Sequence, residues 1–205
     1  MLVTEAGARS QTWGPPIRDA EVRPALRRYL RRDKSAYADT LLIEELGLCQ
    51  GQARIDLLTV SGVLHGYEIK SNRDRLTRLA SQAATYSRVL DRVTLVVCPR
   101  HIEAALQLVP KWWGVLLVRG SAEAVSLDPF RPAAENPDQD PRALVELLWR
   151  DEALELLADH NAQAGVRSKR RPVVWDRVCE VLDVTEIRSA VRYRLRIRAA
   201  TSTPA

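Results

Sequence analysis

Two short apolar stretches in the middle of the chain, ARIDLLTV and VLHGYEIK, lie on either side of a Ser-Gly turn signal. Their length and their branched apolar residues are typical of strands, so together they predict a β-hairpin. The hairpin carries Asp56, Glu68 and Lys70, although a strand buried inside a sheet usually has no charged residues. Packing alone therefore does not explain why these three charged residues are in the hairpin.

The spacing of apolar residues predicts the elements on both sides of this hairpin. A helix is expected from an N-cap at Asp19 through residue 33, and a longer amphipathic helix over residues 73–91. Residues 40–48, TLLIEELGL, suit a strand or a short helix, and a strand is preferred because a CQGQ turn leads directly into the next strand. The remaining expected elements are a strand at 92–99, a short helix at 100–110 and a strand at 112–120.

Strands and helices alternate up to about residue 128, and this order predicts an α/β core. Beyond a proline-rich stretch, apolar periodicity predicts one amphipathic helix over residues 141–161 and at least one further helix. In the segment RYRLRIR, residues 192–198, arginines alternate with apolar or aromatic residues. This alternation is typical of a strand, so the choice between strand and helix stays open for this segment. The expected organisation is a flexible N-terminus (1–18), the core (19–128), a proline-rich loop (129–141) and a helical, basic C-terminal extension (142–205).

Composition limits the class of protein. The chain is 46% hydrophobic and 28% charged, and no apolar run approaches the roughly 18 residues that a membrane helix needs. The N-terminus lacks the basic and then apolar order of a signal peptide, so a cytoplasmic protein without membrane contact is expected. Three cysteines far apart and three histidines argue against a structural zinc site.

Positive charge is concentrated near the C-terminus. Between residues 166 and 198 there are ten arginine and lysine residues against four acidic ones, whereas the whole chain carries a net charge of +5. Such an excess suits either a contact with nucleic acid phosphates or a solvated helix face. The nucleic-acid hypothesis assigns phosphate contacts to a cluster formed by Arg167, Lys169, Arg170 and Arg171.

The length of the hairpin loop decides whether the three charged residues can form a site. A two-residue turn at Ser61-Gly62 would pair Asp56 with Tyr67, on the face opposite to Glu68. A three-residue loop, residues 61–63, would instead pair Asp56 with Glu68. Because only the second register assembles a site, the three-residue loop is predicted.

Two adjacent carboxylates repel each other unless a proton or a cation lies between them, and their hard oxygen atoms suit Mg²⁺ or Mn²⁺. In this arrangement Lys70 would lie beside the metal, where its ammonium group can orient a water molecule or stabilise charge on a phosphate. Hydrolysis of a phosphodiester is the reaction that these groups suit. The alternative is a surface strand on which Asp56, Glu68 and Lys70 form a solvated cross-strand pair.

The segments RID and EIK, with the long helix that follows them, resemble the PD-(D/E)XK nuclease superfamily. The proline of the motif is absent, and Ile55 stands before Asp56. The resemblance implies a restriction-endonuclease-like mixed sheet flanked by helices and a metal-dependent nuclease. It implies that Asp56, Glu68 and the backbone carbonyl of Ile69 bind Mg²⁺ or Mn²⁺, and that Lys70 is catalytic.

The segment QAATY resembles the QxxxY motif of the RecB-type branch, and the whole region is similar to a small standalone bacterial branch of the superfamily. Its spacing places Gln82 and Tyr86 on one face of a helix, where they can brace the site or contact a DNA backbone. Arg54 and Ser71 are further polar residues beside the site, and Arg78 is assigned to phosphate binding or to an ion pair with Asp74.

Many members of the superfamily contribute an additional upstream acid, and Glu45 is the preferred candidate over Glu44 and Glu21. The functional hypothesis is a nuclease acting on DNA. A nucleic-acid-binding module without catalysis and a protein-interaction domain remain as alternatives. The sequence does not decide between a monomer and a homodimer, nor does it identify a protein partner.

Overall fold

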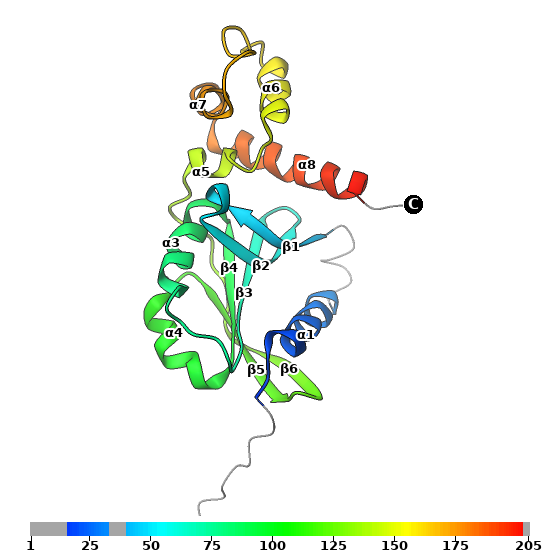
Figure 1. The fold of residues 1–205 in the computed structure, drawn as a ribbon, viewed down its shortest axis with the longest axis vertical. Helices are drawn as coiled ribbons and strands as arrows, with labels where there is room; N and C mark the ends of the chain where they lie inside the picture. The colour runs from blue at the N-terminus through cyan, green and yellow to red at the C-terminus, as the bar shows by residue number, and fades with distance from the viewer. Residues whose placement is uncertain (1–15, 33–39, 203–205) are drawn as a thin grey trace, which may run out of the picture.

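The computed structural model describes residues 16–32 and 40–202, so most of the expected flexible N-terminus lies outside the described residues. The core is a six-stranded sheet whose strands follow chain order (Figure 1). The first three strands and the last two pair antiparallel, whereas β3, β4 and β5 pair parallel, so the sheet is mixed. The strands are β1 (Leu41–Leu48), β2 (Ala53–Val60), β3 (Leu64–Lys70), β4 (Arg92–Val97), β5 (Gly114–Ser121) and β6 (Ala124–Arg131).

Helices pack on both faces of the sheet, which establishes the α/β fold expected from the sequence. On one face, α1 (Asp19–Arg31) buries Val22, Leu26 and Leu30 against Leu57 and Tyr67 of the sheet. The opposite face is covered by α3 (Leu79–Val89), next to α4 (Ile102–Leu108). Short 3₁₀ turns are η1 (Cys49–Gly51) and η2 (Pro99–His101).

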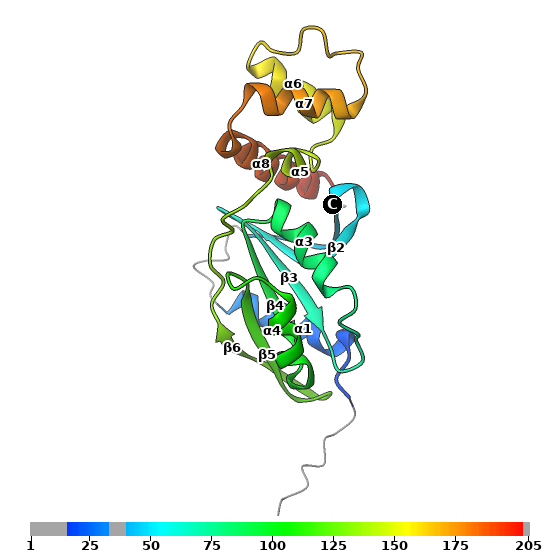
Figure 2. The ribbon, with the colours of Figure 1, turned by 90° about the vertical axis from the view of Figure 1, so that its left-hand side faces the viewer.

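The C-terminal helices share one apolar core with the sheet and α3. They are α5 (Pro141–Val145), α6 (Arg150–Asp159), α7 (Arg171–Val181) and α8 (Val184–Ser202). Trp175 and Val191 of these helices are fully buried in the same apolar cluster as Leu58 and Tyr86 of the sheet and α3. Figure 2 shows α5 and α8 lying between the sheet and the α6–α7 pair. None of the helices within residues 16–32 and 40–202 is long and apolar enough to cross a bilayer.

Several elements differ from the sequence-based expectation. The helix expected over residues 73–91 begins only at Leu79, and the one expected over residues 141–161 is two helices, α5 and α6. Trp149 is extended between them, and its N–H donates to Glu152 Oε2 at 2.7 Å, which caps α6. The capping bond therefore starts a new helix in a segment whose apolar periodicity is continuous.

Two further differences lie in the C-terminal half. The strand β6 was not predicted, and it runs past the expected core boundary at residue 128; its Pro129 is tolerated because β6 is an edge strand. Residues 192–198 form part of α8 and not a strand. Val191 and Leu195, four residues apart, are buried against the core, and this contact favours a helix over the alternating pattern.

Candidate functional site

The hairpin between β2 and β3 has the predicted three-residue loop. Val60 pairs with Leu64, and the last bridge of this ladder joins Leu57 to Tyr67. The Ser61 N–H donates to the Val63 carbonyl at 3.1 Å and closes the loop. In this register the position next to Glu68 belongs to Asp56, so the expected register is confirmed.

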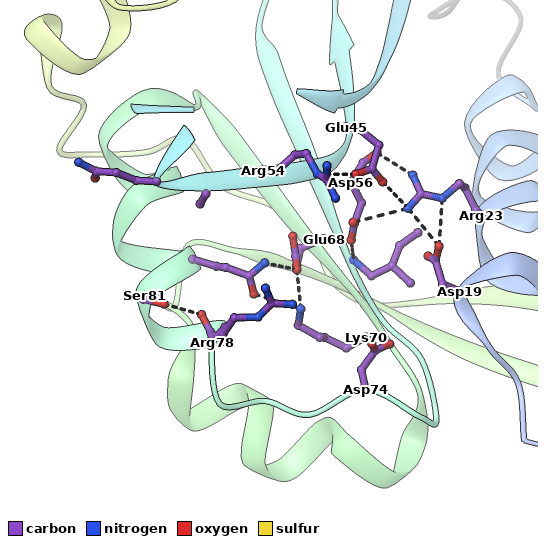
Figure 3. Close-up of a pocket in the computed structure, with 14 residues that line it drawn as sticks. Asp19, Arg23, Glu45, Arg54, Asp56, Glu68, Lys70, Asp74, Arg78 and Ser81 are labelled. Carbon is purple, nitrogen blue, oxygen red and sulfur yellow. Dashed lines mark hydrogen bonds and ion pairs between the residues drawn. The ribbon is translucent and has the colours of Figure 1, made fainter. Parts of the chain in front are cut away.

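The sheet is interrupted where Asp56 lies. The β2–β3 ladder ends at Leu57, and the β1–β2 register passes from Glu44–Leu57 to Leu46–Ile55 without a bridge between Glu45 and Asp56. Glu45 has φ +56°, a left-handed conformation that is uncommon for a residue other than glycine. The break frees the Asp56 side chain, and its Oδ2 atom accepts a hydrogen bond of 2.7 Å from the Ile69 N–H (Figure 3).

Glu68 lies at the centre of a buried polar network built from β3 and α3. Its Oε1 atom accepts hydrogen bonds from Lys70 Nζ at 2.5 Å and from Gln82 Nε2 at 2.7 Å. Its Oε2 atom lies 2.7 Å from the Tyr86 hydroxyl. Lys70 Nζ also donates to Gln82 Oε1 at 3.1 Å. Glu68 and Lys70 are only 1% and 7% exposed, so the alternative of a solvated surface pair is wrong.

Gln82 and Tyr86 are one turn apart on α3 and both reach Glu68 from the same helix face. The Gln82 amide also donates to the Tyr86 oxygen at 3.2 Å. The Tyr86 oxygen lies 2.7 Å from the Arg54 carbonyl as well, which ties α3 to β2. Burial, followed by the charge of Glu68, raises the pKa of Tyr86, so its hydroxyl stays protonated and serves as a donor.

Most of these groups line one polar pocket with a volume of about 360 Å³, and Tyr86 is not among the lining residues. Asp56, Glu68, Lys70, Gln82 and Arg54 all contribute to its wall. Figure 3 shows the Asp56 and Glu68 carboxylates directed into this pocket from neighbouring strands. Glu45, Ile69, Arg78 and Asp74 are among the remaining lining residues.

The carboxyl group of Asp56 has a strongly raised pKa. Burial, and then the charge of Glu68, raise its pKa from 3.8 to about 7. The Ile69 N–H, Arg23 and Lys70 act in the opposite direction, but they do not offset the burial. A cation placed between the two carboxylates would remove this repulsion.

Asp56 and Glu68 are the two carboxylates expected to hold a metal ion. No three histidine, cysteine or acidic side chains within residues 16–32 and 40–202 are grouped to hold a metal ion, so the expected site has Asp56 and Glu68 as its acidic ligands. Two carboxylates with further oxygen ligands from water or substrate form a donor set of the kind that Mg²⁺ accepts. The fit is thus one of ligand type, and Ile69 of the same strand as Glu68 also lines the pocket.

The candidate upstream acids occupy different places. Glu45 lines the pocket and forms ion pairs with Arg23 at 2.8 Å and with Arg54 at 2.6 Å. Glu44 pairs with Arg27. Glu21 accepts the Arg18 N–H at 2.6 Å and thereby caps α1, so it is not part of the pocket.

The residues after β3 form a tight turn beside the pocket. Both the N–H and the hydroxyl of Ser71 donate to Asp74 Oδ2, at 2.7 and 2.6 Å. The Asp74 carboxylate therefore accepts hydrogen bonds from Ser71 and not from Arg78. The expected ion pair between Asp74 and Arg78 is not formed, because α3 begins only at Leu79 and the two residues are not on one helix. Arg78 remains at the pocket wall as an exposed cation.

The basic cluster, residues 167 and 169–171, lies far from the pocket. Figures 1 and 2 show the connection between α6 and α7 at the opposite end of the molecule from the sheet. Arg150 fixes this connection by donating to the carbonyls of Arg167 and Lys169. Arg171 stacks over the Trp175 ring at 4.6 Å. The structure therefore does not bring the cluster together with Asp56 and Glu68.

Sequence reasoning missed Arg23, which reaches the pocket from α1. Its only signal in the sequence is the i,i+4 spacing to Asp19, with which it pairs at 3.1 Å. Such pairs are common on exposed helix faces and do not by themselves point to a site.

The fold and the pocket define an α/β protein with two carboxylates and a lysine gathered on neighbouring strands of a mixed sheet. Residues 17–203 match the family described as Bacteriophage P4 protein cII, and the chain therefore belongs to that family. Protein cII of Enterobacteria phage P4 is 29% identical over 109 residues, which are 53% of this chain and 41% of the relative. The match thus spans less than half of that relative's length. A protein of unknown function from Silicibacter pomeroyi is similar in structure with a TM-score of 0.40 and 21% identity, over 71% of this chain and 96% of the other.

Proposed function

We propose that this protein is a metal-dependent nuclease that hydrolyses phosphodiester bonds in DNA. The observation that carries the proposal is the pocket in which Asp56, Glu68 and the Lys70 ammonium group meet. Two desolvated carboxylates next to an ammonium group suit a reaction in which a phosphate gains negative charge. A structural role alone would not require so much buried charge in one pocket.

Each residue of the pocket has a defined part in this proposal. Asp56 and Glu68 would hold the ion, with the Ile69 carbonyl as a further oxygen ligand. When bound there, Mg²⁺ or Mn²⁺ supplies Lewis acidity for the phosphodiester and lowers the pKa of a water molecule. Gln82 and Tyr86 keep the Glu68 carboxylate in place through its two oxygen atoms. Lys70 presents its ammonium group to the water or to a phosphate oxygen.

The proposal also includes the cellular compartment. Cys49, Cys98 and Cys179 are free thiols. Reduced cysteines suit the cytoplasm, where nucleic acid substrates are present.

The test compares purified wild-type protein with Lys70→Ala and Glu68→Gln. Each is incubated with linear duplex DNA, single-stranded DNA, branched DNA and RNA, in Mg²⁺, Mn²⁺ or a chelator. Lys111→Ala is the matched control, because Lys111 is exposed and does not line the pocket. Cleavage by the wild type and by Lys111→Ala, but not by the two site variants or in chelator, supports the proposal. Equal cleavage by all four proteins contradicts it.

A second function is favoured by the basic cluster, whose side chains form no ion pair within the part of the chain that the structure describes. It is nucleic-acid binding without catalysis. Metal titration separates the two functions, because a binding module has no need to hold a divalent cation between Asp56 and Glu68. Duplex binding that is equally strong in Mg²⁺ and in chelator, with no cleavage in either, would support this second function.

A further inference from the structure

Arg23 fills the break in the sheet at Asp56. Its Nη1 atom donates to the Asp56 backbone carbonyl at 2.9 Å, and this carbonyl belongs to a residue that neither ladder includes. Its Nη2 atom lies 2.8 Å from Glu45 Oε1 and 3.5 Å from Asp56 Oδ1. One guanidinium group from α1 thus contacts both residues that lack a bridge at the break, Glu45 and Asp56.

Most N–H groups of the Arg23 guanidinium already face protein oxygens. Nε and Nη2 both donate to Asp19 Oδ2, at 3.2 and 3.1 Å, and the side chain is 16% exposed. All three nitrogen atoms are therefore engaged, which leaves little capacity to bind a phosphate. Arg23 is better suited to orient other groups than to contact a substrate.

We propose that Arg23 is a positioning residue that fixes the Asp56 carboxylate in the pocket. Asp56 has two restraints: the Ile69 N–H holds Oδ2, and Arg23 holds the backbone carbonyl and lies beside Oδ1. Without Arg23, the strand at the break has no donor for the Asp56 carbonyl, and the side chain loses one of its two restraints. The catalytic consequence rests on the proposed nuclease function, whereas the orientation of Asp56 can be measured without it.

The planar fork of the guanidinium group is essential to this role. It directs Nη1 to the Asp56 carbonyl while Nη2 reaches Glu45 and Nε reaches Asp19. A lysine ammonium group carries the same charge but cannot span these three acceptors from one position. Arg23→Lys should therefore behave like Arg23→Gln and not like the wild type.

The first measurement is amide hydrogen exchange at Ile69 by NMR, which requires neither metal nor substrate. In Arg23→Gln and Arg23→Lys the Ile69 amide should exchange at least about tenfold faster than in the wild type, because its acceptor is no longer held. Other amides of the β3–β4 ladder should keep their protection. The matched control is Arg28→Gln, since Arg28 is exposed on the same helix and does not line the pocket. Unchanged exchange at Ile69 in Arg23→Gln, or full recovery in Arg23→Lys, would overturn the inference.

The second measurement is the cleavage kinetics under the conditions in which the wild type is active. Arg23→Gln should lower kcat by at least about tenfold with little change in KM, because the substrate is not touched. Arg28→Gln should leave both parameters unchanged. If the wild type cleaves no substrate, the nuclease proposal fails and the exchange data alone decide the role of Arg23. If the wild type cleaves and Arg23→Gln has wild-type kcat, the positioning role fails while the nuclease proposal stands.

Discussion

Lys70 Nζ lies 2.5 Å from Glu68 Oε1, and both residues are almost completely buried. The two side chains leave β3 on the same face because they are two positions apart. Helix α3 covers them, and Gln82 bonds to both. Their charges are thus held inside the protein by the elements that also form the pocket.

Lys70→Ala should abolish cleavage and should also destabilise the fold. The substitution leaves the Glu68 carboxylate buried without its cation, a change that typically costs about 3 kcal/mol. A double variant, Glu68→Gln with Lys70→Met, removes both charges and should recover most of this loss without restoring cleavage. Urea unfolding of the single and double variants checks the prediction. If the single variant is as stable as the wild type, Lys70 is not paired inside the protein.

Tyr86→Phe should lower stability by about 1 to 2 kcal/mol, since it removes the hydroxyl between Glu68 and the Arg54 carbonyl. Cleavage should fall as well, because Glu68 Oε2 loses its partner. Tyr193→Phe is a suitable control, as Tyr193 is 60% exposed on α8. Thermal unfolding and initial cleavage rates of both variants provide the comparison, and equal behaviour of the two would contradict it.

The raised pKa of Asp56 predicts a pH-dependent stability. In the folded protein Asp56 keeps its proton up to about pH 7, whereas in the unfolded chain it loses the proton near pH 3.8. The folded state therefore binds more protons between these values, and the contribution of Asp56 to the free energy of unfolding falls as the pH rises. Asp56→Asn should match the wild type at pH 4 and exceed its stability above pH 7 by about 2 kcal/mol, allowing for partial solvent exposure.

Urea unfolding of the wild type and Asp56→Asn at pH 4, 6 and 8 measures this difference. Mg²⁺ should reduce it at pH 8, because the ion would stabilise the charged form of Asp56 only in the wild type. A difference that stays constant across this pH range would show that Asp56 does not titrate as described.

Neutralising the basic cluster should weaken DNA binding in a salt-dependent way if it contacts phosphates. Truncation after Gly165 is unsuitable for this test, since it would remove buried Trp175 and Val191 from the core. A triple glutamine variant at Arg167, Lys169 and Arg170 should reduce the log-log salt slope by about 2 to 3 for duplex DNA.

The control for this experiment is the corresponding triple variant at the end of α1, where three arginines are exposed: Arg28, Arg31 and Arg32. Fluorescence anisotropy in chelator at several salt concentrations gives the slopes. Equal slopes for the wild type and the basic-cluster variant would assign that cluster to a solvated surface.

The sequence alone determined the elements whose signal is local. Two short apolar stretches rich in branched residues define β2 and β3, and the three-residue loop between them was inferred from the need to bring Asp56 beside Glu68. The four-residue spacing of Gln82 and Tyr86 was sufficient to place both on one face of α3. These features depend on residues close in the chain, where strand and helix periods decide which side chains share a face.

Only the tertiary structure decided which charges are buried and what holds them. Arg23 is 33 residues from Asp56 and reaches it because α1 packs across the sheet at the break in the β1–β2 ladder. The helix over residues 192–198 likewise depends on the contact of Leu195 with a core that includes β2 and α3. In both cases the free energy gained by burial against distant residues outweighs the secondary-structure preference of the local sequence. The pattern of neighbouring residues carries no information about that burial.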